Sequence, residues 1–206
     1  MKLKINCDGT ALAWDSSTVE FLTGIKLLGC MIGTRFDKPM QNTGLTFPMR
    51  YFKEQVRLLK HLGFNNDNKE LELCTAKSLD LNENLSSFND YSCEFNNALL
   101  PRTSSTDSKF KVFHEFWKKG YWVTQAAKYG GDFLIYDTNP SQSHAKFIVS
   151  VTSGNVDNLE VLCLVRLATA VNKIAIFCWW NLEQDRMSSR TVIWNGSHIE
   201  DINLII

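Results

Sequence analysis

The segment from Tyr129 to Val151, YGGDFLIYDTNPSQSHAKFIVSV, constrains the fold more than any other part of the chain. Two apolar runs, DFLIY and HAKFIVSV, flank a short polar loop that contains Pro140. Short runs rich in β-branched and aromatic residues, bounded by turn residues, are typical of paired strands. The segment therefore predicts a β-hairpin, with Tyr136 at the end of its first strand and His144 at the start of its second.

Alternation in the second strand predicts which way its side chains point. Successive side chains of a strand lie on opposite faces of the sheet. One face is expected to be apolar and to contain Ala145, Phe147, Val149 and Val151. His144 is then expected on the other face, together with Lys146, Ile148 and Ser150.

The rest of the chain reads as a mixture of strands and helices. Residues 1–14 predict a hairpin with a turn at Asp8-Gly9, followed by a helix capped by Asp15 or Ser16. Helical spacing recurs in residues 51–62, in KFKVFHEFWKKG and in residues 159–171. The segments YWVTQ, KIAIFCWW and RTVIW predict further strands, and an extra strand is possible in the tail after Trp194.

These elements predict an α/β (α+β) protein with two structured parts. We expect a small N-terminal α/β domain over residues 1–64 and a C-terminal domain over residues 109–206, in which helices pack against a mixed sheet. The intervening residues 65–108 are rich in Asn, Ser and Asp. They predict a mostly flexible linker, with short ordered pieces possible near Leu71–Leu73 or Leu99–Leu100.

The charge of the chain is unevenly distributed. The formal net charge is zero, but residues 1–64 carry nine Lys or Arg against five Asp or Glu. Residues 65–109 carry four against eight, so an acidic middle masks a basic N-terminal third. Net charge alone therefore does not indicate a nucleic-acid-binding protein.

The cysteines and apolar runs indicate a soluble intracellular protein. The six cysteines contain no CxxC pair and no zinc-finger spacing, and Cys163 and Cys178 are predicted to be buried thiols. The N-terminus lacks the apolar segment of a signal peptide. The longest apolar run, IAIFCWW, is too short to cross a bilayer, so we expect no membrane insertion.

Three residues at the ends of predicted elements could carry chemistry. Tyr136 ends one strand, His144 begins another, and Lys173 lies between a helix and a strand. A Tyr, a His and a Lys can cleave RNA without a metal or cofactor: two groups transfer protons, and a cation holds the phosphoryl charge. His has an ordinary pKa of about 6.5, suited to the acid, whereas Tyr at about 10 needs a nearby ammonium to act as base. Each residue alone is more often structural.

These motifs resemble the catalytic domain of the tRNA-intron (tRNA-splicing) endonuclease family. The resemblance lies in YGGDFLIYDTNPSQSHAKFIVSV, RLATAVNKIAIF and TVIW. It implies a restriction-endonuclease-like nuclease domain with Tyr136, His144 and Lys173 as catalytic residues. It also implies that Arg166 and Trp194 hold a flipped base of the RNA bulge by stacking. Ala168 departs from the Gly expected after Arg-Leu.

The N-terminal third is similar to the subunit of this family that cuts the 3′ splice site. The similar segments are ALAW and GTRFDKPMQNTGLTFPMRYFKEQVRLL. The resemblance implies endoribonuclease (lyase) activity on intron-containing precursor tRNA, leaving 2′,3′-cyclic phosphate and 5′-hydroxyl ends. It implies RNA binding within a heterotetramer with the other endonuclease subunits. The nucleus is the expected compartment, with the cytosolic face of mitochondria as the alternative.

The sequence leaves two other interpretations open. A metal-dependent nuclease could use Asp132, Asp137 and Lys146, but such a site needs an acid two residues before the Lys, where His144 stands. A non-catalytic scaffold subunit of the same complex is the other possibility, although such a subunit is expected to lack the Tyr–His–Lys set. We therefore expect a catalytic subunit with no metal and no cofactor.

Overall fold

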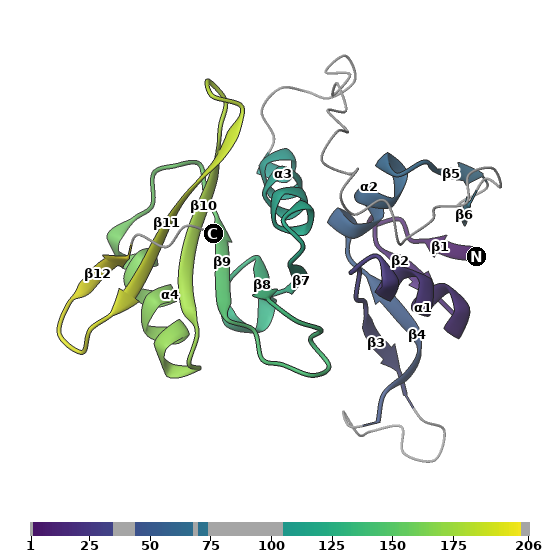
Figure 1. Ribbon diagram of the computed structural model, residues 1–206, viewed down its shortest axis with the longest axis horizontal. Coiled ribbons are helices and arrows are strands. Elements are labelled where there is room, and N and C mark those ends of the chain that lie inside the picture. The colour runs from purple at the N-terminus through teal and green to yellow at the C-terminus, as the bar shows by residue number, and fades with distance from the viewer. Residues whose placement is uncertain (1, 35–43, 68–69, 74–104, 203–206) are drawn as a thin grey trace.

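The computed structural model describes residues 2–34, 44–67, 70–73 and 105–202. Within these ranges the chain forms two six-stranded sheets, one from the N-terminal part and one from the C-terminal part. Helix α3 (Ser105–Lys118) lies between the two parts in Figure 1. No helix in the described ranges is long and apolar enough to cross a membrane.

The N-terminal sheet has the strand order β3-β4-β2-β1-β6-β5, and all its pairs are antiparallel. Its strands are β1 (Lys2–Ile5), β2 (Ala11–Ala13), β3 (Cys30–Gly33), β4 (Thr46–Tyr51), β5 (Phe64–Asp67) and β6 (Glu70–Leu73). The hairpin predicted for residues 1–14 is confirmed as β1 and β2. Strands β3 and β4 were not predicted from the sequence.

Two helices accompany this sheet, and their starts follow from local hydrogen bonds. In α1 (Ser16–Gly24), the carboxylate of Asp15 accepts the Thr18 N–H at 2.7 Å, as predicted for a cap. At the start of α2 (Lys53–His61), the amide oxygen of Gln55 accepts the Phe52 N–H at 3.1 Å. The predicted helix of residues 51–62 is therefore confirmed, although Tyr51 belongs to β4.

The C-terminal sheet has the order β12-β11-β10-β9-β8-β7. Its strands are β7 (Trp122–Gln125), β8 (Phe133–Tyr136), β9 (Phe147–Val151), β10 (Ile174–Asn181), β11 (Arg186–Trp194) and β12 (Ile199–Ile202). Only β9 and β10 run parallel among its described pairs, so the predicted mixed sheet is confirmed. The tail contributes β12 as an extra strand.

Alternation along the strands divides this sheet into two apolar faces. Phe147 and Val149 of β9 pack with α3, whereas Ile148 between them packs with α4 (Asn158–Ala170). Strand β10 alternates in the same way, with Ile176 and Cys178 on the α3 face and Ala175 and Phe177 on the α4 face. Burial raises the pKa of the Cys178 thiol to about 12.

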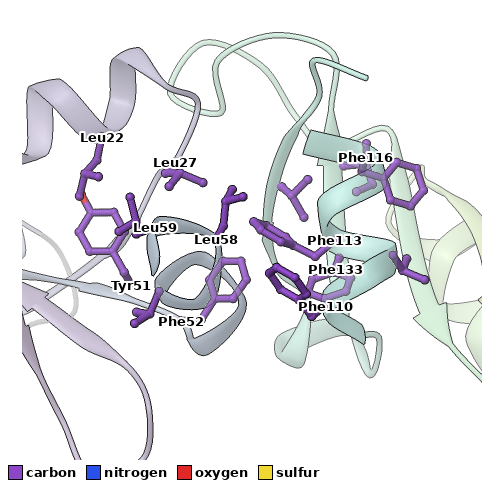
Figure 2. Close-up of a cluster of buried hydrophobic side chains, with 14 of the residues drawn as sticks. Leu22, Leu27, Tyr51, Phe52, Leu58, Leu59, Phe110, Phe113, Phe116 and Phe133 are labelled. Carbon is purple, nitrogen blue, oxygen red and sulfur yellow. The ribbon is translucent and has the colours of Figure 1, made fainter. Parts of the chain in front are cut away.

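The α3 face continues into the N-terminal domain as one hydrophobic core of aliphatic and aromatic side chains (Figure 2). Phe52, at the start of α2, makes an edge contact with Phe113 of α3, with ring centroids 5.4 Å apart. Polar contacts join the same parts: Lys26 Nζ donates to the Gly120 carbonyl at 2.7 Å, and Arg57 pairs with Asp107 at 2.6 Å. The two domains therefore share a core.

The domain boundaries differ from those drawn on the sequence. Strand β6 pairs with β1, so the N-terminal sheet continues to Leu73, past the predicted end at residue 64. Most of the predicted linker, residues 74–104, lies outside the described residues. So does residue range 35–43, which contains part of the similarity to the 3′-cutting subunit.

Candidate active site

The predicted catalytic residues lie where three inner strands of the C-terminal sheet end or begin. We call this line of strand ends the sheet edge. Tyr136 is the last residue of β8, His144 precedes β9 by three positions, and Lys173 directly precedes β10. Strands β8 and β9 are antiparallel, and β9 and β10 are parallel. The end of β8 therefore meets the starts of β9 and β10, and the topology gathers the three residues at this edge.

Backbone hydrogen bonds at Lys146 fix this meeting point. The Lys146 N–H donates to the Ile135 carbonyl at 2.9 Å, and the Lys146 carbonyl accepts the Ile174 N–H at 3.0 Å. One residue thus connects the strand that ends in Tyr136 to the strand that begins after Lys173. The backbones carrying the candidate residues have little freedom to separate.

The loop before His144 is ordered by its own polar side chains. The Asn139 carboxamide oxygen accepts the Ser141 N–H at 3.0 Å, and Thr138 Oγ1 donates to Ser143 Oγ at 2.8 Å. Asn and Thr side chains commonly close turns in this way. The loop ends at His144, whose side chain is exposed.

The predicted orientation within HAKFIVSV is only partly correct. Strand β9 begins at Phe147, so His144 belongs to the loop and not to the strand. Ala145 packs in the α4 cluster with Ile148, on the face opposite Phe147. Strict alternation fails here because the residues before Phe147 do not have the strand's regular pairing.

Lys173 is positioned by the end of α4. Asn172 adopts a left-handed conformation (φ 53°), its N–H donates to the Thr169 carbonyl at 3.1 Å, and the Lys173 N–H donates to the Ala168 carbonyl at 2.8 Å. This pair of bonds is the Schellman motif that ends many helices. It fixes the backbone of Lys173 relative to α4.

The Lys173 ammonium has a ring and a carbonyl as neighbours. Its Nζ lies 5.7 Å from the centroid of the Tyr129 ring and 3.3 Å from the Val171 carbonyl oxygen. Among the described residues it forms no ion pair with an Asp or Glu. Lys146 at the same edge differs, because its Nζ lies 3.4 Å from an Asp137 carboxylate oxygen.

Arg166 and Trp194 lie together beside this edge. The guanidinium carbon of Arg166 in α4 lies 4.9 Å from the centroid of the Trp194 ring at the end of β11. Arg166 is exposed and Trp194 half-buried, so both are accessible to a ligand. The sequence similarity selected this pair, and the structure brings it together.

Tyr129 and Asn172 were not identified as contributors to this edge from the sequence. Tyr129 is the first residue of YGGDFLIYDTNPSQSHAKFIVSV, so its position close to the site could have been expected. The left-handed conformation of Asn172 has a weaker signal, an Asn directly after a helical pattern. The prediction that Cys163 is buried is wrong: it lies on the exposed side of α4, whereas Cys178 is buried as predicted.

The carboxylates considered for a metal site lie apart. Asp132 comes just before β8 and Asp137 just after it, so they stand at opposite ends of the strand. Asp132 is ion-paired with Lys109 at 2.5 Å and accepts the Val151 N–H at 2.7 Å. Within the described residues no three His, Cys, Asp or Glu side chains form a metal-binding group.

Two family models match the chain in the two parts that the fold separates. Residues 106–188 match the tRNA intron endonuclease, catalytic C-terminal domain, and residues 1–66 match the TSEN34-like N-terminal domain. The first match includes Tyr136, His144, Arg166 and Lys173, and ends before Trp194. The C-terminal domain is therefore an α/β nuclease domain.

Curated proteins give the same result. The tRNA-splicing endonuclease subunit Sen34 of Mus musculus is 33% identical over 73 residues, which cover 34% of this chain and 23% of that protein. The tRNA-splicing endonuclease of Hyperthermus butylicus is 35% identical over 69 residues, covering 32% of this chain and 38% of that protein. A probable tRNA-splicing endonuclease subunit sen2 of Schizosaccharomyces pombe is 26% identical over 152 residues, covering 68% of this chain and 39% of that protein.

The chain belongs to the tRNA-intron (tRNA-splicing) endonuclease family. It contains the family's catalytic domain together with an N-terminal domain of the TSEN34-like type. The matched regions span well under half of each of these relatives.

Proposed function

We propose that this chain is a catalytic subunit of a tRNA-splicing endonuclease and cuts precursor tRNA at the 3′ splice site without a metal ion. The observation that carries the proposal is the gathering of Tyr136, His144 and Lys173 at one sheet edge, held there by the backbone bonds of Lys146. The nearby Arg166–Trp194 pair supports it.

The three residues have complementary tasks in this reaction. Tyr136 takes the proton of the ribose 2′-hydroxyl, whose oxygen then forms a bond to the adjacent phosphorus. His144 donates a proton to the 5′-oxygen as its bond to phosphorus breaks. Lys173 stabilises the charge that develops on the phosphoryl oxygens. The products are a 2′,3′-cyclic phosphate and a 5′-hydroxyl, with no oxidant or other co-reactant.

Substrate binding would use Arg166 and Trp194 as two sides of a clamp. A flipped RNA base stacks well between an indole ring and a guanidinium plane. In the free chain the two groups already contact each other at 4.9 Å. We therefore expect Arg166, the more exposed of the pair, to move aside when the base enters.

The subunit type and the partners rest on the N-terminal domain. The N-terminal domain matches the TSEN34-like family model, and the relative named Sen34 is called a subunit, which favours a complex of several chains. We propose a heterotetramer with other endonuclease subunits, in which this chain cuts the 3′ site of an intron-containing tRNA. The basic N-terminal third would contact the RNA backbone, so binding should weaken as salt increases.

The decisive experiment uses this chain co-purified with its partners. An intron-containing precursor tRNA is incubated with the complex in EDTA, and the product ends are mapped. We expect cleavage at the 3′ site with a 2′,3′-cyclic phosphate, and loss of that cleavage by a factor of about 10² to 10⁴ in His144→Ala. His198→Ala is the matched control, because His198 is an exposed His on the turn between β11 and β12.

Other outcomes would point to other functions. Normal 3′-site cleavage by a well-folded His144→Ala complex would refute the assigned role of His144. A requirement for magnesium with a 3′-hydroxyl product would favour a metal-dependent nuclease. Unchanged splicing after replacement of Tyr136, His144 and Lys173 together would favour a scaffold subunit.

We also propose that the chain works in the nucleus, with the cytosolic face of mitochondria as the alternative. A fluorescently tagged chain expressed at its natural level would distinguish these two. Nuclear signal supports the proposal, and signal confined to the mitochondrial surface contradicts it.

A further inference from the structure

The aromatic ring of Tyr129 lies beside the candidate active site without a task in the chemistry described above. Tyr129 ends the short 3-10 turn η2 (Ala127–Tyr129) and is half-buried among the side chains of the α4 face. The Lys173 ammonium lies 5.7 Å from its ring centroid. Attraction between a cation and a ring face is significant within about 6 Å.

The backbone after Tyr129 holds the ring in this place. Gly130 is left-handed (φ 64°) and ends the 3-10 turn. A Cβ on Gly131 would come within 2.6 Å of Ile148 Cγ2, so only Gly allows η2 to approach β9 this closely. The glycines thus allow the close approach of η2 to β9, and the Tyr129 side chain packs on the α4 face. Lys173 follows the end of α4.

The kind of contact made by Lys173 suits its proposed task. A carboxylate partner would hold the ammonium but would also neutralise the charge that a phosphoryl group needs. A ring face attracts the cation through its quadrupole and adds no net charge. Lys146 at the same edge also lies over a ring, that of Phe147 at 5.2 Å, but it has the Asp137 carboxylate as a second neighbour. Among the described residues, the neighbours of the Lys173 ammonium are the Tyr129 ring and the Val171 carbonyl, with no carboxylate.

We infer that Tyr129 is a positioning residue for the proposed RNA cleavage: its ring face keeps the Lys173 ammonium oriented at the sheet edge, with its charge available to the scissile phosphate. The inference rests on the proposed function. Tyr129 touches neither the substrate nor the reacting atoms in this scheme. It acts through Lys173, and its loss should slow the chemical step without weakening RNA binding.

The test compares three replacements of Tyr129 in the assembled complex. Tyr129→Phe keeps the ring, Tyr129→Leu removes it, and a trifluorinated phenylalanine keeps the size while withdrawing electron density from the ring face. The readouts are the single-turnover cleavage rate at saturating complex and the Kd for precursor tRNA. The thermal unfolding midpoint shows whether each variant folds.

We expect Tyr129→Phe to cleave within about twofold of wild type and Tyr129→Leu to cleave about tenfold more slowly, with Kd unchanged in both. The fluorinated variant should fall between them, because its ring face attracts the cation less. A ring that only fills space would give equal rates for phenylalanine and its fluorinated form. That equality, or a Tyr129→Leu rate equal to wild type, would overturn the inference.

The failure of this inference can be distinguished from failure of the proposed function. A wild-type complex that does not cut precursor tRNA overturns both. A wild-type complex that cuts with the expected product ends, while all three Tyr129 variants cut equally fast, overturns only the positioning role.

Discussion

The two faces of the C-terminal sheet use apolar residues for different purposes. The α3 face forms a broad hydrophobic core that continues into the N-terminal domain, with Phe110, Phe113 and Phe116 almost fully buried. The α4 face has a smaller core, and half-buried Tyr129, Tyr136 and Trp194 pack around it. One face therefore joins the domains, and the other supports the candidate site.

This difference explains how one sheet can be stable and also carry exposed polar groups. Alternate side chains of β8, β9 and β10 go to opposite faces, so a change on one face need not disturb the other. Substitutions on the α3 face should therefore lower the free energy of unfolding more than they slow the proposed RNA cleavage. Substitutions at the rim of the α4 face should slow cleavage more than they lower the free energy of unfolding.

The largest stability loss is expected from Phe113→Ala. Phe113 is fully buried, and its ring contacts Phe52 and Phe133 with centroids 5.4 and 5.9 Å away. Removing a buried Phe side chain costs about 3–5 kcal/mol, through lost transfer free energy and the cavity left behind. Urea unfolding of the purified chain measures this loss.

The control for Phe113→Ala is Leu159→Ala on α4. Leu159 is 65% exposed, so its removal should change the free energy of unfolding by no more than about 0.5 kcal/mol. Similar losses in the two variants would mean that the α3 face does not dominate stability.

The next largest effect is expected on RNA binding at the α4 face, not on stability. Arg166→Ala should weaken cleavage at subsaturating precursor tRNA by about 5- to 150-fold, because stacking on a base is worth about 1–3 kcal/mol. The free energy of unfolding should hardly change, since Arg166 is exposed. Cleavage rates across a range of RNA concentrations measure the effect.

Arg190→Ala is the matched control for Arg166→Ala. Arg190 is also an exposed Arg, but its partner is the Asp201 carboxylate at 2.5 Å rather than an aromatic ring. Its replacement should leave cleavage unchanged at every RNA concentration. Equal losses in both variants would indicate a general effect of positive charge and not a base clamp.

The sequence predicted the C-terminal fold better than the N-terminal one, for physical reasons. Segments such as KIAIFCWW and NLEVLCLVRLATAVN are long and strongly patterned, and both form the expected element. Strand β4 was missed because its residues TFPMRY contain a Pro and show no clear alternation. Strands β5 and β6 fall almost entirely in the predicted linker, because Asn, Asp and Glu are poor strand formers. The short ordered piece predicted near Leu71–Leu73 is confirmed as β6, which pairing with β1 stabilises.

The candidate site was predictable where residue type and position agree. The hairpin pattern predicted that Tyr136 ends a strand. The resemblance to the family then selected the other site residues, which are His144, Lys173, Arg166 and Trp194. The side-chain contacts at the site could not be predicted from the sequence. The approach of Lys173 to Tyr129 depends on packing of α4 against η2, which no local pattern reports.

A smaller stability effect is expected where charges join the domains. Arg57 of α2 pairs with Asp107 of α3 at 2.6 Å, and its guanidinium carbon lies 4.2 Å from the Phe110 ring centroid. Arg57→Ala removes both contacts and should cost about 1–2 kcal/mol of unfolding free energy. Arg190→Ala removes an ion pair whose side chains are about half exposed, and should cost no more than about 1 kcal/mol. Equal costs would contradict a special role of the α3 face.

The smallest effect is a pH dependence of stability from His114 on α3. Its ring stacks on Phe110, and burial, followed by the positive charges of Lys118 and His61, lowers the pKa of His114. The folded state thus favours neutral His114, and its contribution is complete above the ordinary pKa of about 6.5. As pH falls below that value, the unfolded chain binds the proton more readily and stability decreases.

His114→Leu isolates this contribution, because other groups titrate in the same region. The pKa of Glu54 is raised by burial, so its ionisation opposes folding and its contribution changes in the opposite direction as pH falls. His61 of α2, whose ring stacks on Phe110 with centroids 5.2 Å apart, also has a pKa lowered by burial. Urea unfolding at pH 7.5 and pH 5.5 (roughly one unit on either side of 6.5) should show a smaller loss in His114→Leu than in wild type. An identical pH dependence in both would mean that the α3 face keeps its stability when His114 is protonated.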